Sequence, residues 1–207
     1  MEKLWVVRYV DYTSKYGLGY LLNSGAAGVY FNDSTKMCGD LDNFVYASYF
    51  VRYRGQSEQR LTLRIADEDH KDPDIRKKLI LIRNFKAFIT SENPKEGTER
   101  GRSVLPLFRT SGAREDDEVH LRKYVRTRQA IVFVLSNKTQ HVIFVDGSED
   151  EVALMPGLEV SVAMPKFSDG VRNFRLTDDI RDERLRRRVD QAVAIIHGLG
   201  IHQTHGG

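Results

Sequence analysis

The sequence repeats a pattern at a constant spacing of 113 residues, since position 22 matches position 135 and position 29 matches position 142. The matching segments are Leu22-Asn23-Ser24 with Leu135-Ser136-Asn137, and Val29-Tyr30-Phe31 with Val142-Ile143-Phe144. Asp33 and Asp146 then stand at equivalent turn positions. Self-similarity at a fixed spacing indicates one structural unit that is present twice. The fold of this chain is therefore expected to contain two similar halves.

Each half begins with short strands joined by turns. In the first half, strands are predicted over residues 5–10, 20–22 and 29–31, and the last two flank the turn Asn23-Ser24-Gly25. Apolar runs on both sides of such a turn are typical of a β-hairpin. In the second half, six strands are predicted, over residues 124–128, 131–135, 142–145, 152–155, 160–164 and 174–176.

Each half is predicted to end with an amphipathic helix. Asp72 is a suitable N-cap for the first helix, and Pro73 occupies its first position. The apolar residues of this helix follow a 3.6-residue spacing and comprise Ile75, Leu79, Leu81, Ile82, Phe85, Phe88 and Ile89. The second helix is predicted to begin at Thr177, which two aspartates follow, and to be capped by Gly198. Its apolar face comprises Ile180, Leu185, Val189, Val193 and Ile196.

Strands followed by a helix in each half predict the α+β class. Because a helix covers only one face of a sheet, two such units bury more surface by packing together, and ligands commonly bind along such a seam. The first unit is expected to span residues 1–90 and the second residues 121–200. Residues 91–120 are interpreted as a polar linker that is partly docked, and only residues 104–108 within it are apolar. The tail from His197, including residues 201–207, is expected to be disordered.

The composition is that of a folded protein without a strong charge bias. Hydrophobic residues make up 41% of the chain and charged residues 29%, and the formal net charge of +3 does not require a nucleic-acid or anionic-membrane partner. No apolar run reaches the roughly 20 residues that span a bilayer. Cys38 is the single cysteine, which excludes an internal disulfide. We therefore expect an intracellular protein, and we expect this chain to be part of a longer one.

The sequence contains no arrangement of residues that is typical of a catalytic or metal site. Gly17 and Gly19 lack the third glycine of a nucleotide-binding loop. His197, His202 and His205 lie among glycines without a neighbouring cysteine, which does not favour a zinc site. Kinase catalytic motifs and a nucleophile elbow are missing from the sequence. We therefore expect no catalysis, no cofactor and no metal ion in this chain.

One string in the first half carries a resemblance to a known family. It consists of Val10-Asp11-Tyr12, Lys15-Tyr16-Gly17-Leu18-Gly19-Tyr20, Gly28-Val29 and Phe31-Asn32-Asp33-Ser34-Thr35, and the second half adds Arg126-Thr127-Arg128 with Leu135-Ser136-Asn137. With these residues the chain resembles the polo-box domain, the tandem C-terminal targeting module of polo-like kinases. The resemblance implies two boxes, each a six-stranded antiparallel sheet with one C-terminal helix. It also implies a non-catalytic region that binds phosphoserine or phosphothreonine peptides in the cleft between the boxes.

The phosphate-binding residues of that family do not recur. In members that bind phosphopeptides, a His-x-Lys pair on the second box grips the phosphate. Counting back from Pro156 places Glu149-Asp150-Glu151 there, and a shift of one residue gives Ser148-Glu149-Asp150. Because a phosphate carries about −1.5 to −2 charges, carboxylates repel it. We therefore predict a degenerate phosphate site at Glu149 and Glu151, although a solvated turn also explains these carboxylates.

In keeping the scaffold without these phosphate-binding residues, the chain resembles the divergent polo boxes of kinetoplastid kinetochore proteins. The alternative is a diverged polo kinase of a protist. The cleft tryptophan of the family aligns with Tyr9. The predicted partner-binding cleft comprises Trp5, Tyr9, Val10, Tyr12, Tyr16, Phe85 and Phe88, although aromatic residues at these spacings are also typical of a core. The expected partner is a segment of a kinetochore or mitotic scaffold protein. The expected location is the nucleus and the kinetochore or chromosome, with cytoskeletal mitotic structures as the alternative.

Two basic clusters allow other interpretations. An alternative anion site, which retains phosphopeptide binding, comprises Arg122, Lys123, Arg126 and Arg128. Strand alternation predicts that Arg126 and Arg128 lie on one face. The second cluster lies on the last helix and comprises Arg181, Arg184, Arg186, Arg187 and Arg188. It offers a contact for DNA, but the acidic residues among these arginines favour charge pairing on a solvated face. Neither a nucleic acid nor a membrane is the expected partner.

Overall fold

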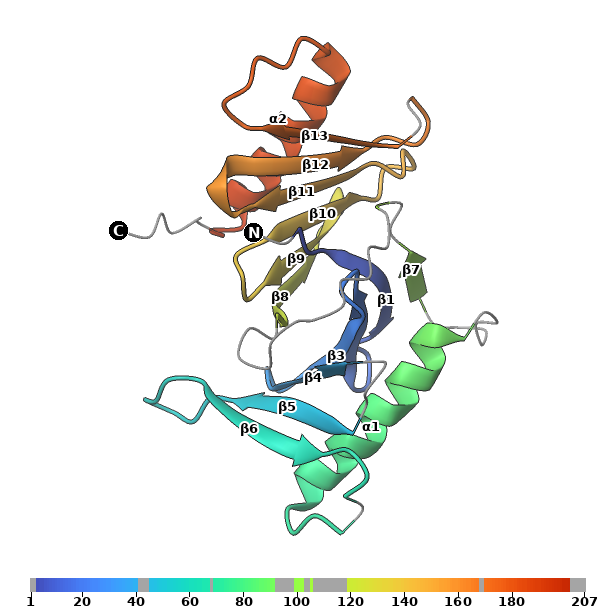
Figure 1. Cartoon of the computed structure of the whole chain (residues 1–207), viewed down its shortest axis with the longest axis vertical. Coiled ribbons are helices and arrows are strands. Elements are labelled where there is room, and N and C mark those ends of the chain that lie inside the picture. Colours follow the sequence, from blue (N-terminus) through green and yellow to red (C-terminus); the bar gives the residue numbers. More distant parts are fainter. Residues whose placement is uncertain are drawn as a thin grey trace. The chain divides into compact units, whose positions relative to one another are not determined.

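The computed structural model describes residues 3–40, 45–67, 69–91, 99–102, 105, 119–167 and 170–201. The chain forms two compact units, each with a sheet and a helix (Figure 1). The N-terminal unit comprises Val6–Arg102 and Leu107–Arg122, and the C-terminal unit comprises Met1–Trp5, Ser103–Pro106 and Lys123–Gly207. The first five residues thus belong to the unit that the second half of the sequence forms.

The N-terminal unit contains seven described strands in one antiparallel sheet, in the order β6-β5-β4-β3-β2-β1-β7. They are β1 (Val6–Tyr12), β2 (Gly17–Leu22), β3 (Ala26–Phe31), β4 (Lys36–Asp40), β5 (Tyr46–Val51), β6 (Gln59–Arg64) and β7 (Glu99–Arg102). The first six follow one another across the sheet, as the expected six-stranded box requires. β7 pairs with β1 and comes from the segment predicted as a linker. Part of that segment therefore extends the sheet.

The hairpin predicted around Asn23-Ser24-Gly25 is present between β2 and β3. The backbone N–H of Gly25 donates to the carbonyl oxygen of Leu22, with 3.0 Å between nitrogen and oxygen. Gly25 adopts a φ of 93°, a left-handed conformation that glycine tolerates without steric cost. The resulting register pairs Gly19 with Val29. This turn therefore sets the alignment of the first strands.

Helix α1 (Pro73–Thr90) begins where the sequence predicts. The Asp72 side chain accepts hydrogen bonds from the backbone nitrogens of Asp74 (2.8 Å) and Ile75 (3.4 Å), which lack partners within the helix. The helix packs on β1 to β4. The buried residues of its inner face are Ile75, Lys78, Leu79, Ile82, Phe85 and Ile89. Five positions of the predicted stripe are therefore confirmed, whereas Leu81 and Phe88 are only partly buried and Lys78, which the apolar pattern did not include, is buried.

The C-terminal unit repeats this design with six described antiparallel strands, in the order β13-β12-β11-β10-β9-β8. They are β8 (Leu121–Arg126), whose first two residues fall in the N-terminal unit, β9 (Ala130–Leu135), β10 (Gln140–Phe144), β11 (Glu151–Met155), β12 (Glu159–Ala163) and β13 (Val171–Arg175). Each overlaps a predicted strand, so the prediction of six strands is confirmed. The repeat makes β9 the equivalent of β2 and β10 the equivalent of β3.

The hydrophobic core of the C-terminal unit lies between its sheet and helix α2 (Glu183–Gly198). Alternate strand residues supply one side of it, among them Ala130, Val132, Val142, Phe144, Val152, Leu154, Val160 and Val162. The helix supplies Leu185, Val189, Ala192 and Ile196. In the described part of the chain, neither α1 nor α2 is long and apolar enough to cross a membrane.

Helix α2 begins later than the sequence analysis predicts. Its N-cap is Asp182, whose Oδ1 accepts a hydrogen bond from the backbone nitrogen of Arg184 at 3.0 Å. Asp178 instead accepts a hydrogen bond from the backbone nitrogen of Arg175 at 2.7 Å and closes a turn before the helix. The predicted start at Thr177 is therefore wrong. Several aspartates in this stretch are suitable caps, and the sequence alone does not rank them.

Ordered structure continues beyond the predicted helix cap. Gly198 is the last residue of α2, and Gly200 adopts a φ of 63° in the turn that follows. The backbone nitrogen of Ile201 donates to the carbonyl oxygen of Ile196 at 3.2 Å, and the Ile201 side chain is buried. The segment from His197 to Ile201 thus has a defined conformation. Residues 202–207, also predicted to be disordered, lie outside the described residues.

Candidate functional site: the groove beside α1

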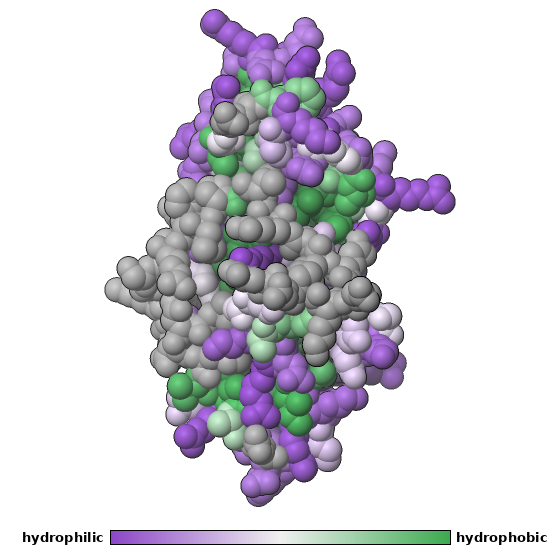
Figure 2. Space-filling model, turned by 90° about the vertical axis from the view of Figure 1, so that its right-hand side faces the viewer, coloured by the Kyte–Doolittle hydropathy of each residue, from purple (hydrophilic) through white to green (hydrophobic). Residues whose placement is uncertain are grey.

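A groove lies along α1 on the surface of the N-terminal unit. It has a volume of about 630 Å³ and is lined by Tyr16, Pro73, Arg76, Lys77, Ile80, Leu81 and Asn84. Tyr16 comes from the connection between β1 and β2, and the other lining residues come from α1. Figure 2 shows hydrophobic surface between hydrophilic side chains at the end of the view where α1 lies. The groove, called the α1 groove below, thus offers both apolar contact and polar groups.

The face of β1 that carries Val10 and Tyr12 lies under α1. Val10 pairs with Gly19 of β2, and a Cβ atom at Gly19 would lie 2.3 Å from Cδ1 of Phe85. Only glycine therefore allows the helix to approach the sheet this closely. Because side chains alternate along a strand, Tyr12 shares this face and Tyr9 points to the opposite one.

A tight turn brings Tyr12 and Tyr16 together at one end of the α1 groove. The backbone nitrogen of Tyr16 donates to the carbonyl oxygen of Tyr12 at 2.9 Å, and the ring centroids lie 5.5 Å apart. Asp11 Oδ1 accepts hydrogen bonds from the backbone nitrogen (3.0 Å) and Oγ1 (2.6 Å) of Thr13. Asn32 Nδ2 donates to the carbonyl oxygen of Thr13 at 2.8 Å. Local hydrogen bonds thus hold the two rings in place.

The lining of the α1 groove includes an unmatched hydrogen-bond donor on Arg76 and an exposed apolar side chain on Ile80. Ile80 is 43% exposed, although it is a large apolar side chain on a helix. Nε of Arg76 is buried and has no hydrogen-bond partner among the described residues. A buried donor without an acceptor costs about 1–3 kcal/mol, and an oxygen atom of a ligand recovers this energy only if the arginine side chain rotates to expose the nitrogen. Lys77 adds a second positive charge to the lining.

Five residues of the predicted cleft lie on the α1 side of the sheet. Val10 and Phe85 are 1% and 8% exposed and do not line the groove. Tyr12, Tyr16 and Phe88 are partly exposed. Of the five, only Tyr16 lines the groove directly. Of the predicted cleft residues, Tyr16 thus lines the groove and Tyr12 lies against Tyr16.

The two remaining residues of the predicted cleft lie elsewhere. Tyr9 points to the sheet face opposite α1, whereas Trp5 precedes β1 and belongs to the C-terminal unit. Both side chains are buried. The sequence analysis also missed Arg76, Lys77 and Ile80 as groove residues. Their one sequence signal is that the apolar Ile80 falls outside the stripe that faces the sheet.

The predicted degenerate phosphate site is not a solvated turn, which corrects that interpretation. Glu149 is exposed, but Glu151 is 1% exposed and is the first residue of β11. Its Oε2 lies 3.0 Å from Nε2 of His141 on the neighbouring strand β10. Asp150 is fully buried, and its Oδ2 lies 2.6 Å from Nε of Arg188. Two of the three carboxylates are therefore paired inside the C-terminal unit.

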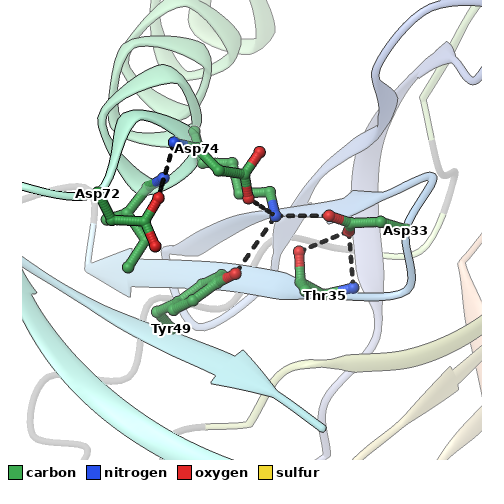
Figure 3. Close-up of polar contacts among 7 residues, drawn as sticks. Asp33, Thr35, Tyr49, Asp72 and Asp74 are labelled. Atoms are coloured by element: carbon green, nitrogen blue, oxygen red, sulfur yellow. Dashed lines mark hydrogen bonds and ion pairs between the residues drawn. The ribbon is translucent and has the colours of Figure 1, made fainter. Parts of the chain in front are cut away.

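A buried lysine connects α1 to the turn that follows β3 (Figure 3). Nζ of Lys78 lies 2.5 Å from Asp33 Oδ2, 2.6 Å from Asp74 Oδ2 and 3.2 Å from Tyr49 Oη. Burial disfavours the charged lysine, but these hydrogen bonds outweigh burial and raise the pKa of Lys78. Burial also disfavours the ionised Asp33, but hydrogen bonds from Lys78 and Thr35 lower the pKa of Asp33. The contact fixes the helix that carries the groove.

An arginine makes the equivalent connection in the C-terminal unit. Nη1 of Arg188 donates to Oδ2 of Asp146, the repeat equivalent of Asp33, at 2.9 Å. The guanidinium carbon of Arg188 lies 4.2 Å from the centre of the Phe144 ring. The contact with Asp150 is an ion pair whose angles do not suit a hydrogen bond. A cation on α1 thus contacts the connection between β3 and β4, and a cation on α2 contacts the equivalent connection between β10 and β11.

The residues of the alternative anion site are exposed but do not share one face. β8 ends at Arg126, so Arg128 lies in the connection to β9. The prediction that alternation places Arg126 and Arg128 on one strand face is therefore wrong. Within β8, Arg122 and Arg126 share a face and Lys123 points to the other.

The arginine-rich surface of α2 shows the expected charge pairing in part. Nη2 of Arg186 lies 3.0 Å from Oδ1 of Asp179, and both side chains are largely exposed. Arg184 lies over the ring of Phe167, with 4.8 Å between the guanidinium carbon and the ring centre. Arg188 departs from the expectation of a solvated face because only 15% of its side chain is exposed.

Comparison with known proteins identifies the family. The model of the POLO box duplicated region matches residues 14–79. The probable serine/threonine-protein kinase CCRP1 of Zea mays is 35% identical over 150 residues, which cover 72% of this chain and 22% of that protein. The serine/threonine-protein kinase PLK1 of Xenopus laevis is 31% identical over 181 residues, which cover 83% of this chain and 25% of that protein. The chain thus spans a quarter or less of the length of these two relatives.

Solved structures of the polo-box domain of budding yeast Cdc5 share the fold. The complex with an Spc72 phosphopeptide has a TM-score of 0.67 at 17% identity, covering 93% of this chain and 70% of that chain. The complex with the Dbf4 polo-interacting region has a TM-score of 0.69 at 18% identity, covering 96% of this chain and 73% of that chain. The family model matches part of the N-terminal unit, and the fold of these structures agrees with the two sheet-and-helix units. This chain is therefore a polo-box domain, the protein-interaction module of the polo-like kinase family.

Proposed function

We propose that this polo-box domain is a non-catalytic targeting module that binds a segment of another protein in the α1 groove. Through this contact it places the kinase or kinase-like protein that contains it at a kinetochore or a related mitotic structure. The observation that carries the proposal is the buried Nε of Arg76, which has no acceptor in the described part of the chain and lies on a groove with the exposed Ile80. A bound segment supplies an oxygen atom to Arg76 and an apolar side chain to Ile80.

Binding in this groove needs no phosphate grip on the second box. Asp150 and Glu151 face Arg188 and His141 within the fold, so these two basic residues are already engaged. Glu149 adds an exposed negative charge at the same connection. A phosphate with about −1.5 to −2 charges meets repulsion there. We therefore propose that the His-x-Lys grip of phosphopeptide-binding relatives has no counterpart in this chain.

A matched pair of helix variants tests the groove. Affinity purification with the intact domain identifies the partner, and calorimetry with synthetic segments of that partner measures the dissociation constant. Ile80→Ser removes the exposed apolar contact and is expected to weaken binding about tenfold or more. Ala87→Ser, at an exposed position of α1 outside the groove lining, is expected to leave the dissociation constant unchanged. Equal binding by both variants would show that the segment binds elsewhere.

The phosphate prediction is tested with the same peptides. A phosphorylated copy of the segment is expected to bind no more tightly than the unmodified copy. A tenfold or larger gain from phosphate, if it changes when Glu149 is replaced by alanine, contradicts the proposal of a lost grip. In cells, a fluorescent fusion is expected to leave the kinetochore with Ile80→Ser and to remain there with Ala87→Ser.

A phosphopeptide-binding domain that uses other cations is the second candidate. Arg122, Lys123, Arg126 and Arg128 are exposed, and one of the similar solved structures is a phosphopeptide complex. This candidate predicts binding that weakens steeply with added salt, because exposed charges are screened. It also predicts a loss of affinity for the phosphorylated segment with Arg128→Ala. An unchanged affinity in both measurements would exclude this candidate.

A further inference from the structure

The residues that line the α1 groove follow the spacing of one helix face. All but Tyr16 come from α1, at positions that fit an i, i+3, i+4, i+7 pattern: Pro73, Arg76, Lys77, Ile80, Leu81 and Asn84. At a rise of about 1.5 Å per residue, this face extends for about 16 Å along the helix. These α1 residues are called the outer stripe below.

The centre of the outer stripe is apolar. Ile80 is 43% exposed, and Leu81 beside it is partly buried. In the described part of the chain, α2 has no large hydrophobic side chain with such exposure, so this feature distinguishes α1 from its repeat equivalent. Apolar side chains of a partner that cover Ile80 and Leu81 remove them from water, which favours binding.

The charge of the α1 groove is positive. Among the described residues that line it, Arg76 and Lys77 are cations and none is acidic. Over its whole length, α1 contains five basic residues and one acidic residue, Asp74. Oδ2 of Asp74 lies 2.6 Å from Nζ of the buried Lys78, so this carboxylate is already paired within the fold. A partner whose charge complements the groove is therefore acidic.

The α1 groove offers no strand edge to an extended segment. Its lining consists of α1 and of Tyr16, which lies in the connection between β1 and β2. Because the backbone groups inside a helix bond to one another, an extended segment on α1 finds no ladder of partners and leaves its own backbone groups unpaired where water is excluded. A helix pairs its own backbone groups and presents side chains at the spacing of the outer stripe. The lining thus favours a helical partner.

Given the function proposed above, we propose that the partner segment bound in the α1 groove is an acidic amphipathic helix. Its apolar stripe covers Ile80 and Leu81, and carboxylates beside that stripe face Arg76 and Lys77. Its side chains, three and four residues apart, fit between those of α1, which is the common mode of helix packing. Binding in the groove alone fixes neither this conformation nor this charge.

The described helices of a second copy of this chain fit the α1 groove poorly. The outer stripe of a second α1 contains no carboxylate, so it does not neutralise Arg76 and Lys77. Helix α2 contains four arginines and two acidic residues, so it is basic as well. A partner helix with an excess of glutamate or aspartate provides the charge that both α1 and α2 lack.

Three synthetic peptides test the proposal by calorimetry with the intact domain. The first is an acetylated and amidated fifteen-residue alanine peptide with leucines along one helix face and glutamates beside them, and it is expected to bind. The second has lysine in place of each glutamate and is expected not to bind. The third has proline in place of a central alanine on the face opposite the leucines. It is expected to bind about tenfold more weakly or worse, because proline inside a helix breaks it.

A matched pair of charge reversals locates the bound peptide. Lys77→Glu places a carboxylate in the α1 groove and is expected to weaken binding of the glutamate peptide about tenfold or more. Lys123→Glu makes the same change at an exposed position outside the groove lining. Its affinity is expected to stay within about twofold of that of the unchanged chain. Circular dichroism establishes that both variants fold.

The proposal is overturned if the glutamate peptide does not bind, if the proline peptide binds equally well, or if Lys77→Glu and Lys123→Glu have equal effects. It is also overturned if a DNA duplex displaces the glutamate peptide and itself loses affinity with Lys77→Glu. The natural partner segment separates the helix from the function proposed above. A segment that loses affinity with Ile80→Ser but tolerates a central proline binds as an extended chain, which retains that function and overturns the helix. A segment that Ile80→Ser leaves unaffected contradicts both.

Discussion

Arg188→Met is expected to lower the free energy of unfolding more than Lys78→Met does, although each substitution removes one cation from a helix. Both substitutions keep most of the aliphatic packing and remove one charge. Without Arg188, the fully buried Asp150 is left without its cation, and removing one partner of a buried pair costs about 3–5 kcal/mol. Without Lys78, the remaining carboxylates Asp33 and Asp74 are 48% and 60% exposed, so water solvates them. We therefore expect a smaller cost, about 1–2 kcal/mol, for Lys78→Met.

Urea unfolding measures this difference. Trp5 is the single tryptophan, is buried, and belongs to the same compact unit as Arg188, so its fluorescence follows that unit, and circular dichroism follows the whole chain. Asp150→Leu in the Arg188→Met background removes the carboxylate that Arg188→Met leaves without a cation. This second substitution is expected to restore most of the lost stability. The reasoning is refuted if Lys78→Met costs as much as Arg188→Met, or if the double variant is no more stable than the single one.

Three further predictions concern stability. Gly19→Ala is expected to lower the free energy of unfolding by about 1–3 kcal/mol, because the new Cβ atom would lie 2.3 Å from Cδ1 of Phe85. Thermal denaturation measures this loss. A Gly19→Ala protein as stable as the parent would contradict this packing. Gly198→Ala is the matched control: it meets no atom within 4 Å at the end of α2 and is expected to stabilise the chain by up to about 1 kcal/mol. Protonation of Asp33 and Asp146 is expected to contribute to acid unfolding. Burial disfavours both ionised carboxylates, but hydrogen bonds outweigh burial and lower the pKa of each in the fold. The stability that these two ionised aspartates contribute is present above the unfolded-state pKa of about 3.9 and is lost as the pH falls through the lower folded-state pKa. Lys78→Met removes one cause of the lowered pKa of Asp33. Its urea midpoint should therefore fall less between about pH 5 and pH 2 than that of the unchanged chain.

The elements that sequence patterns predict best are those whose signal is local. Asp72 and Pro73 define the start of α1 because a capping carboxylate and a first-turn proline act through their own backbone. The start of α2 was missed because neighbouring aspartates compete for the same role. β7 was missed because its sequence, Glu-Arg-Gly-Arg, has no apolar alternation and pairs with a strand far away in the sequence.

The candidate site was predictable only in part, for a related reason. Tyr12 and Tyr16 were found because the family string contains them. The buried charges of Lys78 and Asp150 were not predicted, because hydropathy places charged residues outside and only the pairing partner shows that they are buried. The unmatched Nε of Arg76 is a property of three-dimensional packing and leaves no trace in the sequence.

The division of the chain between the two units determines whether one unit can be separated from the other. The chain passes between the units after Trp5 and again after Arg122. No single break in the polypeptide therefore releases one unit whole, and limited proteolysis at one peptide bond cannot yield two native fragments. For the same reason, recombination within one connecting segment cannot move one half as an independent unit.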